Sequence, residues 1–250
     1  LASNSWKVNS YSPVWADTNV ILIRDAIHFV NRRGMTFCAA LGNDGLYGNP
    51  RNYPVSLDDD WILSVGGTGP DGQYKDKFNG EASFAASWGN GIDIAAPCSH
   101  SLIYTDSYTN GFQSFAGTSA ATPHVAGVAG LILSYMNVPG NAYQNMAPED
   151  VEAIIELSAT DVNSPGFDTL TGAGRLNAGA AMRLIEKPMK SVTHFGTNNL
   201  SPFTKSVTQV STSTTVLLRE TYQRPSDNAW FPRGYYKVNA YRIDATVNHT

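Results

Sequence analysis

A run of small and apolar residues at 120–136 constrains the fold of this chain more than any other stretch. It is apolar nearly all round, as expected of a helix packed inside a domain rather than lying on its surface. Pro123 is tolerated only near the start of such a helix, where backbone N–H groups lack intrahelical partners. The sequence therefore predicts a loop at 115–118 that places Ser119 at the helix N-terminus. Free N–H groups and the positive end of the helix dipole would face any group that Ser119 attacks.

The residues around Ser119 also form a motif. Gly-Thr-Ser at 117–119, two alanines, Thr122 and then Pro-His at 123–124 are similar to the nucleophile motif of the subtilisin-like serine proteases, the subtilases. The resemblance implies that Ser119 is the nucleophile that becomes acylated. A glycine-rich loop with an N-cap serine is the simpler interpretation of Gly-Thr-Ser alone, but Pro-His and the buried helix favour the nucleophile. The serine does not lie in a Gly-x-Ser-x-Gly sequence, which argues against an α/β-hydrolase.

A strand, helix and strand with short connections are predicted upstream of this motif. Residues 1–6 read as the end of a strand, and Asp17 is a suitable N-cap for a helix over 18–33 that Gly34 ends. Residues 35–41 read as a buried strand, which Gly-Asn-Asp-Gly at 42–45 ends abruptly. This order is typical of a parallel sheet.

Asn43 follows that strand, as an asparagine does in subtilases. The resemblance implies that its side-chain amide donates a hydrogen bond to the oxyanion of the tetrahedral intermediate, and a fixed donor there favours the transition state. An ordinary turn asparagine is the alternative. The order of the motifs and the 76 residues between Asn43 and Ser119 favour the oxyanion donor.

By the same resemblance, two segments form the walls of the pocket for the residue before the scissile bond. The predicted wall residues are Ser5, Trp6 and Lys7 on one side and Ala40, Leu41 and Gly42 on the other. Backbone groups near Ser5 would pair with an extended substrate, while pockets give side-chain preference. Lys7 stands where the family often has glycine, so the resemblance does not indicate which side chain is preferred. A surface loop without function is the alternative for the first wall.

The general base and its orienting carboxylate are not found in the sequence. Subtilases supply them from two motifs upstream of the asparagine, and a serine needs both to become a strong nucleophile. Asp17-Thr-Asn opens a helix only 26 residues before Asn43, and His124 belongs to the serine motif. The chain starts at Leu1, without Met, inside what reads as a strand. We therefore interpret it as a fragment that lacks protease activity by itself; a degenerate, non-catalytic binding module is the alternative.

Together these features predict an α/β fold. Residues 1–188 are expected to be the C-terminal part of a three-layer subtilisin-like domain with a mostly parallel central sheet, incomplete at its N-terminus. Helices are expected at 147–159 and after Asn177, which caps the second of them. Runs rich in Thr, Val and Tyr at 204–218 and 234–247 predict strands of an appended β-rich module over 189–250, with an unknown ligand.

Composition narrows the function further. The net charge is −4 and there is no basic run, so nucleic acid is not an expected partner. No apolar segment approaches the length of a membrane span. Cys38 and Cys98 are interpreted as two buried thiols, with a disulfide left open. The acidic run at 58–60 is interpreted as a solvated turn, with a structural calcium site as the alternative.

The resemblance to subtilases implies the remaining properties. We expect a protein or peptide substrate, chemistry that requires neither a cofactor nor a catalytic metal, and a secreted or cell-surface location.

Overall fold

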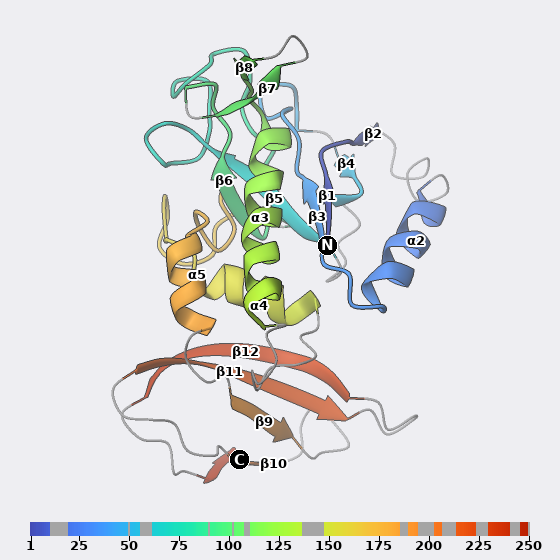
Figure 1. The fold of residues 1–250 in the computed structure, drawn as a ribbon, viewed down its shortest axis with the longest axis vertical. Coiled ribbons are helices and arrows are strands. Elements are labelled where there is room, and N and C mark those ends of the chain that lie inside the picture. Colours follow the sequence, from blue (N-terminus) through green and yellow to red (C-terminus); the bar gives the residue numbers. More distant parts are fainter. Residues whose placement is uncertain are drawn as a thin grey trace.

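The computed structural model describes most of the first 185 residues and five strands beyond them. The described residues are 1–10, 20–49, 51–55, 62–89, 91–101, 103–107, 111–136, 148–185, 190–194, 203–206, 214–223, 230–240 and 246–249. Figure 1 shows the arrangement of the helices and strands along this chain.

A four-stranded parallel sheet lies at the centre of the first 185 residues. Its strands are β1 (Ala2–Asn4), β3 (Phe37–Ala40), β5 (Leu63–Thr68) and β6 (Ile94–Pro97), in the spatial order β1-β3-β5-β6. All three neighbouring pairs are parallel. β3 and β5 are buried along their whole length, as strands covered on both faces should be.

Alternate residues of the strands enter two separate apolar clusters, because successive side chains of a strand point to opposite faces. Phe37 and Ala39 lie in one cluster, whereas Cys38 lies in the other. Helix α2 (Ile21–Asn31) contributes Ile27 to the first cluster and covers that face of the sheet.

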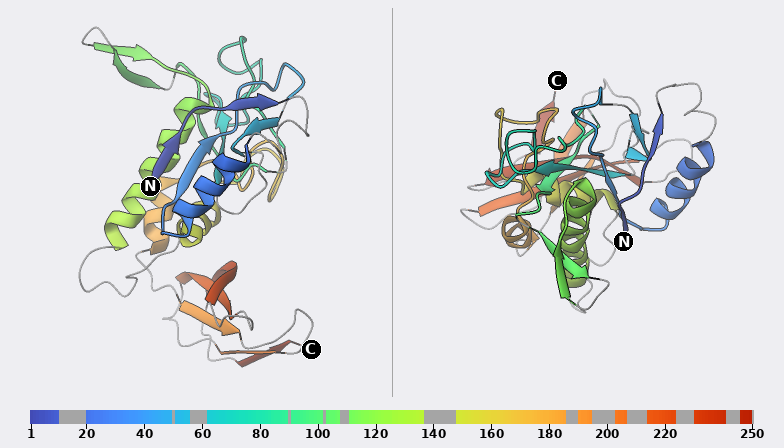
Figure 2. Two further views of the ribbon diagram at one scale, coloured as in Figure 1. Left: turned by 90° about the vertical axis from the view of Figure 1, so that its right-hand side faces the viewer. Right: turned by 90° about the horizontal axis from the view of Figure 1, so that it is seen from above.

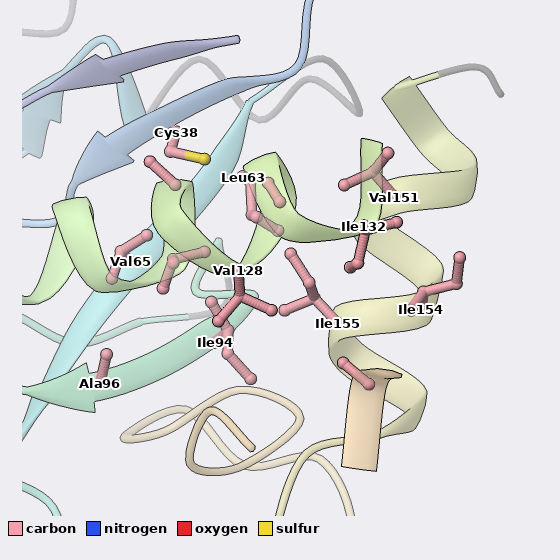
Figure 3. Close-up of a cluster of buried hydrophobic side chains, with 14 of the residues drawn as sticks. Cys38, Leu63, Val65, Ile94, Ala96, Val128, Ile132, Val151, Ile154 and Ile155 are labelled. Atoms are coloured by element: carbon pink, nitrogen blue, oxygen red, sulfur yellow. The ribbon is translucent and has the colours of Figure 1, made fainter. Parts of the chain in front are cut away.

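Three helices cover the opposite face: α3 (Thr118–Met136), α4 (Pro148–Leu157) and α5 (Ala178–Ile185). Figure 2 shows α2 and α3 on different sides of the sheet. In Figure 3, Val128 and Ile132 of α3 lie among Leu63, Ile94 and Ile155, which come from two strands and α4. Helix, parallel sheet and helix layers confirm the predicted three-layer α/β fold.

Two small antiparallel pairs and a second, larger sheet complete the described structure. β2 (Val8–Ser10) pairs with β4 (Arg51–Tyr53), and β7 (Tyr104–Ser107) pairs with β8 (Gly111–Ser114). The larger sheet has the order β12-β11-β9-β10-β13. Its strands are β9 (Lys190–His194), β10 (Phe203–Ser206), β11 (Thr214–Gln223), β12 (Trp230–Ala240) and β13 (Thr246–His249).

Most predicted element boundaries differ from the observed ones by a few residues. The helix expected at 18–33 is α2, with Val20 at its N-cap, and the predicted cap Asp17 lies outside the described residues. The Asn177 side chain accepts a hydrogen bond from the Ala180 N–H (2.9 Å) and caps α5 as predicted. The single strand-like run expected at 204–218 is divided between β10 and β11. The division of the chain at residues 188–189 stays a prediction.

Two further predictions concern the cysteines and membrane insertion. Cys38 and Cys98 are both free and buried, as the favoured interpretation had it. Among the described helices, none is long and apolar enough to cross a bilayer. The acidic run at 58–60 lies outside the described residues.

Candidate active site

Ser119 is the second residue of helix α3, at the end of the segment that leads from β6 to the helix. Gly117 precedes the helix with φ of 101°, a region that favours glycine. Its N–H donates to the Cys98 carbonyl (2.8 Å), which ties the loop to the end of the sheet. The Ser119 N–H has no carbonyl four residues earlier within the helix to bind, as at any helix start. The predicted position of the serine is therefore confirmed.

Ser119 forms two reciprocal contacts with Ser5. The Ser119 hydroxyl donates to the Ser5 carbonyl (3.2 Å), and the Ser5 hydroxyl donates to the Ser119 carbonyl (2.9 Å). Pro123 lies four residues after Ser119 inside the helix and has no N–H to donate to that carbonyl. The proline thus leaves the Ser119 carbonyl available to Ser5, and the two segments are joined at the helix start.

Asn43 lies beside the same helix start. Its Oδ1 accepts hydrogen bonds from the Thr118 N–H (2.9 Å) and the Thr118 hydroxyl (3.3 Å). The side-chain oxygen is therefore occupied, and the Nδ2 group is turned away from Thr118 with no acceptor among the described residues. A Cβ on Gly117 would lie only 2.8 Å from this Nδ2, so the glycine allows the close approach. An N–H donor is thus held next to Ser119.

The second predicted wall, at residues 40–42, is held tightly from behind. The Gly42 N–H donates to the Thr118 hydroxyl (3.0 Å), which joins the wall to α3. Asn52 is buried and donates from Nδ2 to the Leu41 carbonyl (2.8 Å). Gly42 has φ of 118°, and a Cβ there would lie 2.1 Å from Asn52 Nδ2. Ala40 and Leu41 are themselves buried.

The first predicted wall is more exposed. Trp6 is 45% exposed, and its Nε1 donates to the Asn4 side chain (3.3 Å). β1 and β3 are parallel neighbours, with Asn4 beside Ala39. The segments that follow the two strands therefore emerge at one edge of the sheet, and the structure brings both predicted walls to Ser119.

Lys7 forms an ion pair with Asp44, a contact that sequence reasoning missed. The Lys7 ammonium contacts Asp44 Oδ2, and the two side chains are 28% and 19% exposed. Lys7 belongs to the first wall, and Asp44 directly follows Asn43. No local pattern relates residues 37 positions apart, so the only available signal was the opposite charge of the two side chains.

No general base accompanies Ser119 among the described residues, in agreement with the sequence. The only side chain or carbonyl that accepts from its hydroxyl is the Ser5 carbonyl. His124 Nδ1 lies 2.8 Å from the Ala120 carbonyl of its own helix. His124 also lines a cavity of about 260 Å³ beside the helix start, together with Ile103, Tyr104, Thr105, Phe115, Ala120 and Pro123.

Three carboxylates form a group that could hold a cation. One oxygen each of Asp93, Glu152 and Glu156 lies within 4.8 Å of the other two, and all three residues are half-buried. Carboxylate oxygens suit calcium. Sequence reasoning pointed instead to the acidic run at 58–60 and missed this group, because its members are about 60 residues apart in the sequence. Each of the three also has another interaction within the protein.

Neither cysteine is a rival nucleophile. Burial raises the pKa of Cys38 to about 12, and the neighbouring Glu152 carboxylate adds to the rise. Burial likewise raises the pKa of Cys98 to about 12. The thiolate is the reactive form of cysteine, so both thiols remain protonated and unreactive near neutral pH.

The sequence profile of the Subtilase family matches residues 2–174 of the chain, which contain β1 to β8, α2 to α4, Ser119 and Asn43. The chain belongs to the subtilase family. The matched range ends shortly before α5 and does not reach the strands beyond residue 190.

Curated relatives are proteases of this family. Thermitase of Thermoactinomyces vulgaris is 32% identical over 161 residues, covering 64% of this chain and 49% of the relative. Alkaline elastase YaB of Bacillus sp. (strain YaB) is 33% identical, with shares of 64% and 36%. Subtilisin Savinase of Lederbergia lenta is 32% identical, with shares of 64% and 51%. The chain thus spans about half the length of these relatives or less.

Solved structures share the fold. A lanthipeptide protease superposes with a TM-score of 0.59 at 19% identity, over 74% of this chain and 61% of that one. The prenylagaramide maturation protease PagA has a TM-score of 0.56 at 25% identity, over the same shares. At these identities the first likeness concerns the fold alone, and it agrees with the three-layer architecture.

Proposed function

We propose that the protein acts as a serine endopeptidase and that Ser119 forms the acyl-enzyme. One observation carries the proposal: Thr118 joins the side chain of Asn43 to the start of α3, so that a fixed amide donor lies next to the serine. Membership of the subtilase family supports it.

In this proposal the Ser119 hydroxyl oxygen attacks the carbonyl carbon of the scissile peptide bond. The developing oxyanion accepts hydrogen bonds from the Ser119 N–H and from Asn43 Nδ2. Both donors are positioned before the reaction, so they stabilise the transition state without reorganising. Breakdown of the tetrahedral intermediate releases the amine and leaves an ester on Ser119, which water then hydrolyses.

We place the general base, a histidine, and its orienting aspartate in sequence upstream of these 250 residues. The relatives that match are longer than this chain, and no described histidine contacts the Ser119 hydroxyl. Without the base Ser119 is a weak nucleophile, so the 250 residues by themselves are expected to be inactive.

The remaining parts of the proposal concern the substrate and the setting. Residues 5–7 and 40–42 form the two walls for the residue before the scissile bond, and an extended peptide pairs with the backbone near Ser5. Calcium bound by Asp93, Glu152 and Glu156 would be structural, since the chemistry requires no cofactor. We propose a secreted or cell-surface location, and a β-rich module over 189–250 with a ligand of its own.

The test is covalent labelling of the full-length protein that carries its upstream sequence. A fluorophosphonate probe loses fluoride to the activated serine, and mass spectrometry locates the adduct. We expect an adduct on Ser119 that disappears in Ser119→Ala. A folded full-length protein without any adduct would contradict the proposal and favour the non-catalytic binding module.

A further inference from the structure

The ion pair between Lys7 and Asp44 joins the two predicted walls of the substrate pocket. Lys7 lies three residues after β1 ends, and Asp44 lies four residues after β3 ends. Because β1 and β3 are parallel neighbours, both residues stand at the edge of the sheet where Ser119 lies. The pair therefore spans the space between the walls rather than decorating the outer surface.

Asp44 is fixed in place by more than Lys7. Its backbone N–H donates to the Ser87 hydroxyl (3.1 Å), and its Oδ2 accepts from Asn52 Nδ2 (3.3 Å). Asn52 and Ser87 are both buried. The carboxylate is thus a built part of the second wall, and it would keep its position if Lys7 were replaced.

The pair is also better shielded from water than an ordinary surface pair. Its side chains are 28% and 19% exposed, whereas those of Arg24 and Asp25 on α2 are 44% and 63% exposed. Exposed pairs contribute little because water screens them. Removing one member of a shielded pair leaves the other charge without a partner, which is unfavourable. Such a charge attracts an oppositely charged ligand.

We propose that the Lys7–Asp44 ion pair determines which side chain the protein accepts before the scissile bond. The proposal rests on the serine endopeptidase function and on the two walls. With both charges satisfied by each other, the pocket offers no free charge, and a charged substrate side chain would be desolvated there without compensation. The substrate class is therefore a peptide with an uncharged side chain at this position.

The pair also makes the preference switchable. Lys7→Met leaves the Asp44 carboxylate unpaired and should favour lysine or arginine. Asp44→Asn leaves the Lys7 ammonium unpaired and should favour glutamate. The double variant Lys7→Met/Asp44→Asn contains neither charge and should return to uncharged side chains.

The experiment uses the full-length protein and fluorogenic peptides that differ only in the residue before the scissile bond. Matched pairs of similar shape, Lys against Met and Glu against Gln, isolate the effect of charge. We expect Lys7→Met to raise the Lys/Met ratio of kcat/KM about tenfold, and Asp44→Asn to raise the Glu/Gln ratio about tenfold, as one charge-assisted hydrogen bond in a partly shielded site would. The double variant should lie within about threefold of the wild type in both ratios.

A matched control is Asp25→Asn, which breaks the exposed pair on α2 and should leave both ratios unchanged. Fluorophosphonate titration counts active sites in every preparation, so loss of folded protein is not mistaken for changed preference. Unchanged ratios in variants that label at Ser119 would overturn this inference while the proposed function stands. A wild type that labels but prefers Lys over Met, or Glu over Gln, by tenfold would also overturn it, whatever the variants do. A wild type that does not label would instead contradict the proposed function.

Discussion

At the scale of single residues, the site depends on which hydrogen-bonding groups are already occupied. Thr118 takes the Asn43 oxygen and leaves the amide N–H groups for a ligand. Pro123 has no N–H for the Ser119 carbonyl, which the Ser5 hydroxyl then binds. A small number of such contacts orients both the predicted nucleophile and the predicted oxyanion donor.

Asn43→Ala tests the oxyanion donor. The substitution removes a donor that is needed only when negative charge develops, so kcat should fall while KM changes little. The expected fall is about 100- to 1,000-fold, the size known for loss of one such donor in a subtilisin, a member of the same family. Steady-state kinetics of the full-length protein give both parameters. A raised KM with unchanged kcat would show that Asn43 binds the ground state instead.

Gly117→Ala tests the close approach between the serine loop and Asn43. An alanine would be strained at φ of 101°, and its Cβ would lie 2.8 Å from Asn43 Nδ2. We expect a loss of stability of about 1–3 kcal/mol and a large fall in kcat/KM, measured by denaturant unfolding and peptide hydrolysis. Gly111→Ala in β8 is the control, because a Cβ there meets nothing within 4 Å. Equal effects of the two substitutions would contradict this explanation.

At the scale of elements, the segment between β5 and β6 is organised around a buried lysine. The Lys75 side chain is fully buried, and its ammonium donates to the carbonyls of Glu81 (2.7 Å), Phe84 (3.0 Å) and Asp76. Three donors meet three acceptors, so the charge is compensated by hydrogen bonds. Burial nevertheless lowers the pKa of Lys75, against the opposing effect of nearby Cys98, Glu81 and Asp76.

Lys75→Met should therefore destabilise the protein although it replaces a charge with an apolar side chain of similar length. Three carbonyls would lose their donor, and each buried unsatisfied group costs about 1 kcal/mol or more. We expect a loss of about 3 kcal/mol in the free energy of unfolding, measured with denaturant. Lys77→Met, at an exposed position two residues later, should change it by less than about 0.5 kcal/mol. A stabilised Lys75→Met protein would show that burying the charge costs more than its hydrogen bonds contribute.

At the scale of the whole molecule, the sheet is covered on both faces, and its core encloses ionisable groups that report on global stability. The Cys38 thiol has a pKa of about 12 in the folded protein because it is buried, against an ordinary value of 9.0. Above pH 9 the unfolded chain loses this proton while the folded protein keeps it. The folded state then binds more protons, so stability falls as the pH rises from about 9 to 12.

Cys38→Ala should weaken this alkaline loss of stability. Each such thiol contributes a slope of up to about 1.4 kcal/mol per pH unit above pH 9. The free energy of unfolding, measured at pH 8, 9 and 10, should therefore decline less steeply in the variant. Lys75, whose pKa is lowered, acts in the opposite direction below pH 10.5, but it is present in both proteins. Parallel pH profiles would mean that the thiol already ionises alike in both states.

Local sequence was enough to predict the three-layer fold and the position of Ser119. The apolar run at 120–136, the helix and strand patterns and the glycine before the serine each act over one or two turns of chain, where side-chain type and backbone conformation are directly linked. The roles of Ser119, Asn43 and the two walls came from resemblance to subtilases and stay predictions. The placement of Asn43 beside Thr118 agrees with them.

Only the tertiary structure decided which distant groups meet. It pairs Lys7 with Asp44, gathers Asp93, Glu152 and Glu156, and buries Lys75 among carbonyl groups. These contacts depend on the order of the strands and on where each loop leaves the sheet, which a short-range pattern does not encode. The sequence by itself determined the elements and the nucleophile's position, whereas the charges that face a substrate were determined by packing, because charge pairing depends on proximity in space rather than along the chain.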